Sequence, residues 1–205
     1  MTKYSSLFTP IKIGHVEIKN RIGMAPMAPS GMCMPDYCFN QRAVDYYVER
    51  AKGGTGLIIT GGIEVENVLE ETKPGIFQNI GPSPDAFSLL ASEMTERVHA
   101  YGAKIFLQIT MGFGRVSFYP DMVKTPPIAP SPVSHFWQKD VMCRELSTEE
   151  VEYLVRKMGD AAVVAAESGF DGVEIHAMHE GYLIDQFTMA AFNQRTDKYG
   201  GDLRG

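Results

Sequence analysis

The stretch GFDGVEIHAMHEGYLIDQF, from Gly169 to Phe187, contains the pattern that decides the predicted fold. Its first glycine ends a helical pattern, and the apolar segment from Gly172 to His176 is typical of a short buried strand. Parallel α/β sheets and barrels collect their functional groups where strands end. Here the strand leads into three side chains that can donate or move a proton, namely His176, His179 and Tyr182.

Upstream of this stretch, strand patterns alternate with helix patterns. A strand is predicted to start at Gly23 and to break at Pro26, and further strands are predicted at 56–62 and 103–109. Each is followed by a helical pattern, and this alternation predicts parallel pairing with right-handed crossovers. No GxGxxG motif follows a strand, so the pattern favours a barrel over a dinucleotide-binding fold.

Local signals mark the ends of three predicted helices. Their predicted N-terminal caps are Asn40, Ser83 with Pro84 behind it, and Ser147 in a capping box with Glu150. Glycines are predicted to end them, at Gly53, Gly102 and Gly169. The predicted buried faces hold Ala43, Val44, Tyr47, Val48 and Ala51; Phe87, Leu90, Ala91, Met94, Val98 and Tyr101; and Val151, Leu154, Val155, Met158, Ala162 and Ala165.

The predicted fold class is therefore α/β, the N-terminal half of a TIM (β/α)8 barrel with about four parallel strands. A small β-hairpin around the Gly14–His15 turn is expected in front of it, at about residues 11–20. We expect residues 1–205 to form a single domain, with the βα units at about 22–205. The long connection from Thr110 to Leu146 is expected to serve as a lid or a binding loop.

Composition limits the classes of partner. The chain has 205 residues, a net charge of −6 and 44 % hydrophobic residues, which argues against nucleic acid or anionic membrane as the main partner. No apolar run is long enough to span a bilayer. Three cysteines without CxxC spacing are expected to be free thiols in a reducing cytosol, so the predicted location is cytoplasmic. We expect the remaining histidines on the surface, namely His15, His99 and His135.

The predicted strands all end on one face of a barrel. Taken singly, each strand end has an ordinary structural explanation: a proline that stops a strand, a glycine in a turn, a histidine in a core. Gln108 is less ordinary, because an amide at the end of an apolar strand needs partners for both its donor and its acceptor. Together the four ends predict a site, at Ala25–Ala28, Gly61–Gly62, Gln108 and His176.

Several motifs resemble the old yellow enzyme family of FMN-dependent ene-reductases. They are HAMHEGYLIDQF with FNQRTDKYGG (Phe192–Gly201), LFTPIKIGHVEIKNRIGMAPM (Leu7–Met27) and FLQITMGFGR (Phe106–Arg115). The extra Glu180 after His179 and the longer GFG before Arg115 resemble the branch that includes 2,4-dienoyl-CoA reductases and bile-acid-inducible steroid reductases.

This resemblance implies an enzyme that reduces the C=C bond of an α,β-unsaturated carbonyl compound with hydride from flavin. It implies that FMN lies against Ala25, Pro26, Met27 and Ala28, that Gly62 lets the backbone approach the ring, and that Gln108 binds the pyrimidine edge. His176 and His179 would hold the substrate carbonyl oxygen and Tyr182 would supply the proton. Asn193, Arg195 and Asp197 would order the loop after the fourth strand.

The resemblance also implies NAD(P)H as reductant and a small-molecule substrate, and it leaves open a homo-oligomer. The branch adds iron–sulfur and FAD groups in a C-terminal region. A complete barrel takes about 250 residues and normally binds phosphate after strands 7 and 8. We therefore expect the 205 residues alone to retain FMN poorly.

Two alternatives come from other classes. One is a metal-dependent hydrolase or lyase whose ligands are His176, His179 and a carboxylate, Glu174 or Asp185. The other is a non-catalytic fragment that folds or associates only with its missing C-terminal half.

Overall fold

A parallel sheet forms the centre of the computed structural model, which describes residues 3–179 and 181–202. Four strands lie side by side in chain order: β3 (Gly23–Met24), β4 (Leu57–Ile59), β6 (Lys104–Thr110) and β9 (Gly172–Ile175). A further strand, β5 (Ile63–Glu64), pairs with β6 beyond the end of β4. Neighbouring parallel strands in chain order are the arrangement of a (β/α)8 barrel, so the predicted half-barrel is confirmed.

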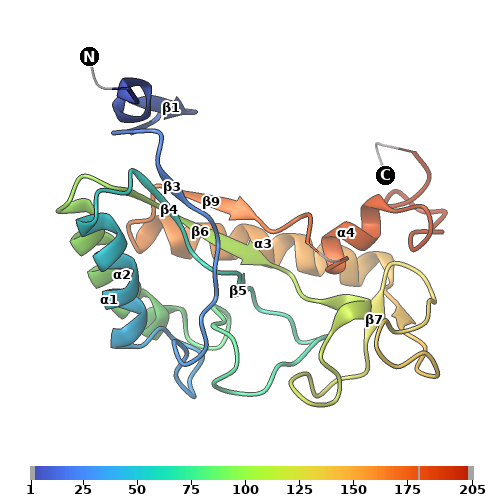
Figure 1. The fold of residues 1–205 in the computed structure, drawn as a ribbon. Coiled ribbons are helices and arrows are strands. Elements are labelled where there is room, and N and C mark those ends of the chain that lie inside the picture. The colour runs from blue at the N-terminus through green and yellow to red at the C-terminus, as the bar shows by residue number, and fades with distance from the viewer. Residues whose placement is uncertain (1–2, 180, 203–205) are drawn as a thin grey trace.

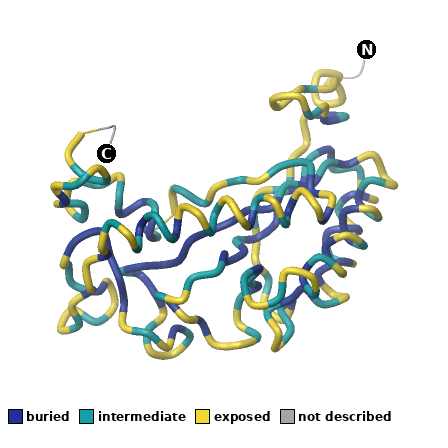
Figure 2. The backbone as a smooth tube through the Cα atoms, turned by 180° about the vertical axis from the view of Figure 1, so that it is seen from behind, coloured by how far each residue is buried: buried dark blue, intermediate teal, exposed yellow. Residues whose placement is uncertain are grey.

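Three helices connect these strands and pack against the sheet (Figure 1). They are α1 (Gln41–Lys52), α2 (Pro84–His99) and α3 (Thr148–Glu167), and a short fourth, α4 (Leu183–Thr188), follows β9. Burial concentrates on the central strands and on the helix faces turned towards them (Figure 2). The helices cover a face of the sheet, and the loops that follow β3, β4, β6 and β9 meet at the carboxyl ends of these strands.

The predicted hairpin is present as antiparallel β1 (Ile11–Ile13) and β2 (Val16–Ile18), and it stands apart from the sheet (Figure 1). The 110–146 connection contains a short parallel pair, β7 (Ile128–Ala129) with β8 (Arg144–Glu145). Two 3₁₀ turns complete the description, η1 (Ser5–Phe8) and η2 (Gly114–Val116). Among the described residues, no helix combines the length and the apolar character that a membrane crossing requires.

The helix starts agree with the sequence signals. The Asn40 side chain accepts a hydrogen bond from the Ala43 N–H at 3.1 Å, and Ser147 forms the predicted capping box with Glu150. All five predicted core positions of α1 are buried. Two predictions on the other helices are wrong: Tyr101 lies beyond the end of α2 and is 45 % exposed, and Val155 is half-exposed. The buried stripe of α3 is narrow, so a flanking valine stays in contact with solvent.

His135 was expected on the surface and is fully buried. Its Nε2 donates to the Ser117 carbonyl oxygen at 2.9 Å, and its Nδ1 accepts from the Gln138 N–H at 3.1 Å. Because both ring nitrogens have backbone partners, this histidine is stable in the interior. No motif around His135 indicates these hydrogen bonds.

The strand predicted at 56–62 is interrupted after Ile59. A Cβ atom on Gly61 would lie 2.5 Å from the Met27 carbonyl oxygen, so the backbone of the first strand end touches the second here. Tyr47 of α1 fixes this contact: its hydroxyl accepts from the Gly61 N–H at 3.0 Å and donates to the Met27 carbonyl oxygen at 3.3 Å. The close approach bends the chain, and β5 resumes the pairing.

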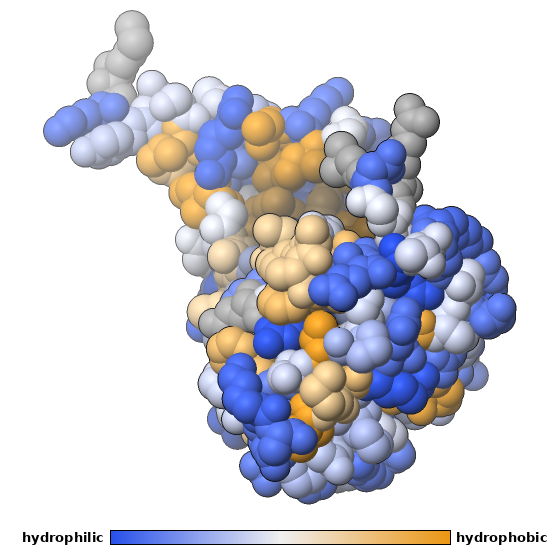
Figure 3. All heavy atoms as spheres, turned by 90° about the vertical axis from the view of Figure 1, so that its right-hand side faces the viewer, coloured by the Kyte–Doolittle hydropathy of each residue, from blue (hydrophilic) through white to orange (hydrophobic). Residues whose placement is uncertain are grey.

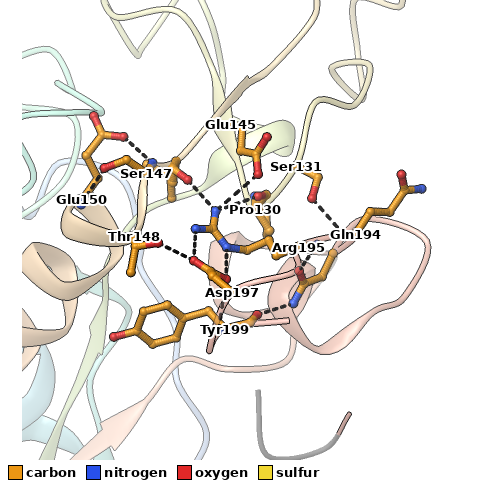
Figure 4. Close-up of polar contacts among 12 residues, drawn as sticks. Pro130, Ser131, Glu145, Ser147, Thr148, Glu150, Gln194, Arg195, Asp197 and Tyr199 are labelled. Atoms are coloured by element: carbon orange, nitrogen blue, oxygen red, sulfur yellow. Dashed lines mark hydrogen bonds and ion pairs between the residues drawn. The ribbon is translucent and has the colours of Figure 1, made fainter. Parts of the chain in front are cut away.

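Arg195 has a structural role, as expected (Figure 4). Its guanidinium is buried, donates to the carbonyl oxygens of Pro130 and Leu146, and pairs with Asp197 at 2.5 Å. The guanidinium holds the pKa of the Asp197 carboxyl well below its usual range. Thr148 at the start of α3 donates to the same carboxyl. The segment after α4 is thereby tied to the 110–146 connection and to α3.

The tyrosine contact predicts a stability effect. Tyr47→Phe should lower the free energy of unfolding by about 1–3 kcal/mol, because it leaves the buried Gly61 N–H without an acceptor. The matched control is Tyr46→Phe, in which the ring under Arg50 is kept. Urea denaturation checks both variants, and equal midpoints for the two would contradict the role given to the Tyr47 hydroxyl.

Candidate active site

A cleft of about 580 Å³ lies where the strands end, within the usual range for small-molecule sites. It brings together most of the residues predicted from the sequence: Pro26, Met27, Ala28, Gly62, Gln108, His176, His179 and Tyr182. Among the described residues, Ala25 is exposed and does not line the cleft. After the β3–β4 pairing at Gly23 and Met24, the chain next contacts the second strand end at Met27 and Ala28, beside Gly61, and Ala25 lies before this contact.

The β6–β9 register sets the floor of the cleft. Gln108 lies opposite Glu174, and its Nε2 donates to the Glu174 Oε1 at 2.7 Å. This bond orients the buried amide so that its Oε1 lies beside Gly62, 3.4 Å from the position of a Cβ atom there. Glu174 was considered in the sequence only as a metal ligand; its place two residues before His176 on the strand was the signal for a shared face.

The two histidines and the tyrosine form a triangle of rings. Ring centroids are 5.2 Å apart for His176 and His179, 4.9 Å for His176 and Tyr182, and 5.3 Å for His179 and Tyr182. Two imidazoles this close can direct N–H donors at one oxygen atom, and a phenol stands beside them. The branch-specific feature at Glu180 lies outside the described residues.

The loop that carries this triangle is held by Asp185 of α4. One carboxylate oxygen accepts from the backbone N–H groups of His179, at 2.7 Å, and Gly181, at 2.9 Å. Asp185 is buried, and Glu174 is engaged by Gln108, so neither carboxylate joins the histidine pair. Within 3–179 and 181–202, no three His, Cys, Asp or Glu side chains are grouped to bind a metal ion. Among the described residues, this arrangement offers no carboxylate as a third ligand beside the two histidines.

The surroundings of His176 shift the pKa of its imidazole. Burial lowers its pKa below the ordinary value of 6.5, the neighbouring His179 lowers it further, and the carboxylates of Asp185 and Glu174 act in the opposite direction. The lowered pKa favours the neutral imidazole. A neutral imidazole donates one N–H and suits a neutral carbonyl oxygen as partner.

Aromatic rings form one wall of the cleft. Phe77 and Phe113 line it, with ring centroids 5.0 Å apart, and Phe113 meets the Tyr182 ring edge-to-face at 4.9 Å. Phe113 lies in the 110–146 connection, for which a role as lid or binding loop was expected, whereas Phe77 was missed. Four other aromatic residues do not border this cleft in the described part of the chain: Tyr37, Phe118, Phe136 and Trp137.

The opposite side of the cleft is open to solvent. Met27, Ile175 and Met178 line the cleft and are each more than half exposed. Seen towards the strand ends, the molecule has a hollow between its N- and C-terminal segments in which hydrophobic atoms gather (Figure 3). The site is thus an open, partly apolar cleft with polar groups on its floor and along one side.

Comparison with known proteins agrees with this geometry. The model of the NADH:flavin oxidoreductase / NADH oxidase family matches residues 6–205. The chain is 55 % identical over 201 residues to a cinnamate reductase of Clostridium sporogenes and 40 % identical over 203 residues to an NADH oxidase of Thermoanaerobacter brockii. It spans 98 % and 99 % of its own length in these matches but only 30 % of the length of each relative.

Solved structures give the same fold. Morphinone reductase superposes with a TM-score of 0.81 at 30 % identity, covering 99 % of this chain and 56 % of the other. An old yellow enzyme homologue from Zymomonas mobilis gives 0.77 at 32 % identity, covering 97 % of this chain and 56 % of the other. The resemblance to the old yellow enzymes is confirmed, and the specific branch stays a prediction.

The lowered pKa of His176 can be measured by histidine side-chain NMR. We expect His176 to titrate below pH 6.5, and His179→Asn to raise its pKa while burial still keeps it below 6.5. Between the pKa of His176 in the folded protein and 6.5, the unfolded state binds more protons than the folded state. The free energy of unfolding should therefore rise with pH in that window. Titration of His176 above 6.5 in the folded protein would contradict this description.

Proposed function

We propose that this chain, which belongs to the NADH:flavin oxidoreductase / NADH oxidase family, is the part of an FMN-dependent enzyme that reduces α,β-unsaturated carbonyl compounds. In this proposal residues 1–205 act as one FMN-binding unit and NAD(P)H is the reductant. The observation that carries the proposal is the convergence of four strand ends on one cleft, with a glutamine amide on its floor and a His–His–Tyr triangle beside it.

The residues of the cleft fit an isoalloxazine ring. Pro26, Met27 and Ala28 offer an apolar edge, and Gly61 and Gly62 keep the adjacent backbone free of side chains. The Gln108 amide is held by Glu174 with its Oε1 towards Gly62, so it is ready to accept from an N–H on a planar ring. When bound, FMN would supply the hydride that is added to the β-carbon of the substrate.

The chain's own part in the reaction is polar. N–H donors of His176 and His179 would hold the carbonyl oxygen and withdraw electron density from the conjugated C=C bond. A phenol has a reference pKa of about 10 and so can act as a proton donor at neutral pH. In this proposal Tyr182 donates its proton to the α-carbon. The C=C π bond is then replaced by two C–H bonds, one from the hydride and one from this proton.

A finer proposal concerns the substrate. The 55 % identical relative is named a cinnamate reductase, and we propose a planar arylacrylic acid or a close derivative as the substrate class here. The wall formed by Phe77 and Phe113 supports this, because flat aromatic groups pack well against aromatic side chains. The two phenylalanines and the two histidines line the same cleft. The aryl group of the substrate would pack against the phenylalanines, and its carbonyl group would bind to the histidines.

The role of Tyr182 predicts a specific defect. Tyr182→Phe in the FMN-loaded protein should slow reoxidation of the reduced flavin by cinnamate or another unsaturated carbonyl compound by about 10²-fold or more. Reduction of the flavin by NADH should be unchanged, because it needs no proton from this phenol. Stopped-flow absorbance of the flavin separates the two half-reactions.

The control is Tyr101→Phe, which lies between the end of α2 and the start of β6 and should leave both half-reactions unchanged. Unchanged reoxidation in Tyr182→Phe would remove the proposed proton donor. Because the 205 residues alone are expected to retain FMN poorly, this test uses a protein of the relatives' full length. Such a protein that neither binds FMN nor oxidises reduced FMN with any unsaturated carbonyl compound would contradict the proposed function as a whole.

A further inference from the structure

A buried carboxylate lies behind the aromatic wall, outside the residues that line the cleft. Glu70, from the loop after β5, is only 4 % exposed. Its Oε1 accepts from the Phe113 N–H at 2.5 Å, and its Oε2 accepts from the Gly114 N–H at 2.7 Å. Two adjacent backbone amides thus bind the two oxygens of one carboxyl group and fix the turn. Burial raises the pKa of this carboxyl to about 7, and the two N–H donors act in the opposite direction by favouring the ionised form.

The turn after β6 is shaped around this carboxylate. Gly112 has φ +131°, a conformation that favours glycine, and a Cβ atom there would lie 2.8 Å from the Glu70 Oε1. The neighbouring Asn67 donates from its Nδ2 to the Met111 carbonyl oxygen at 2.7 Å. The loop after the second strand therefore determines the path of the loop after the third.

Gln186 of α4 holds the same turn from the other side. Its buried Nε2 donates to the Phe113 carbonyl oxygen at 3.1 Å and to the Gly181 carbonyl oxygen at 2.7 Å. Its Oε1 accepts from the Arg115 N–H at 3.3 Å. Because Gly181 directly precedes Tyr182, this one amide joins the turn after β6 to the loop that carries the tyrosine.

Glu70 and Gln186 both bind the backbone of Phe113, whose ring lies against Tyr182. The Phe113 ring is buried and meets the Tyr182 ring at 4.9 Å between centroids, while His176 and His179 lie on other sides of that tyrosine. A shift of the turn would therefore move the ring that supports the phenol. None of the atoms of Glu70 lines the cleft, so its effect on a substrate must pass through Phe113.

We infer that Glu70 is a positioning residue for Tyr182: its carboxylate holds the Gly112–Gly114 turn, and this turn, together with Gln186, holds the phenol. The functional part of the inference rests on the proposed function, in which Tyr182 donates the proton. Glu70 then affects the step that oxidises the flavin and leaves the step that reduces it unaffected.

The test uses Glu70→Gln in the FMN-loaded protein, with Glu71→Gln as the matched control. The glutamine keeps the shape of Glu70 but turns an N–H donor towards a backbone N–H, so one of the two hydrogen bonds is lost. Glu71 is the adjacent, exposed carboxylate that pairs with Lys124. Misplacing a reacting group by about 1 Å can cost about 10²-fold in rate.

In stopped-flow measurements we expect Glu70→Gln to slow flavin reoxidation by cinnamate about 10-fold or more. Flavin reduction by NADH should stay within about 2-fold of the wild-type rate, since the turn has no part in it. Glu71→Gln should change neither rate. Wild-type reoxidation rates in a folded, FMN-loaded Glu70→Gln protein would overturn the inference and leave the proposed function standing.

Two structural measurements do not depend on activity. Backbone amides of Phe113 and Gly114 should exchange hydrogen slowly in the wild type, and the ring resonances of Tyr182 should shift in Glu70→Gln but not in Glu71→Gln. If Glu70→Gln fails to fold, fast exchange of these two amides in the folded wild type overturns the inference, and slow exchange supports it. Slow exchange in the wild type together with a Tyr182 shift in Glu70→Gln would support the positioning role even if the wild type did not react with unsaturated carbonyl compounds. That lack of reaction would refute the proposed function alone.

Discussion

The parallel pairing of β6 with β9 is the constraint on which the candidate site depends. It places Gln108 opposite Glu174 and lets the chain leave the sheet at His176, immediately after the last paired residue, Ile175. Because side chains alternate along a strand, a slip of one residue would turn Glu174 and His176 to the other face. The glutamine amide would then lose its partner, and the two polar groups of the fourth strand would leave the cleft.

Beyond the strand ends, buried polar side chains hold the loops in place. Asp185 binds two amides of the histidine loop, and Gln186 joins this loop to the turn after β6. Glu70 and Tyr47 perform the same task between other pairs of strand ends. Such groups are costly to bury unless satisfied, so each of them specifies one loop conformation. The geometry at the mouth of the sheet is therefore fixed by hydrogen bonds as well as by apolar packing.

Local signals were enough to predict the strand–helix alternation and the helix starts, since caps such as Asn40 act on residues within one turn. The strand-end rule then identified most residues that line the cleft. Glu70 and Phe77 were not predictable, because their roles depend on contacts with residues far away in the chain. The same limit explains His135, whose Nε2 partner, Ser117, lies 18 residues earlier in the chain, and the exposed edge of α3 at Val155.

The most direct test of the account is a crystal structure of the protein with FMN and cinnamate bound. The account predicts the flavin ring against Pro26, Gly62 and Gln108, and the oxygen of the unsaturated acid on His176 and His179. Electron density for the flavin away from the carboxyl ends of the strands, or for the acid remote from both imidazoles, would contradict it.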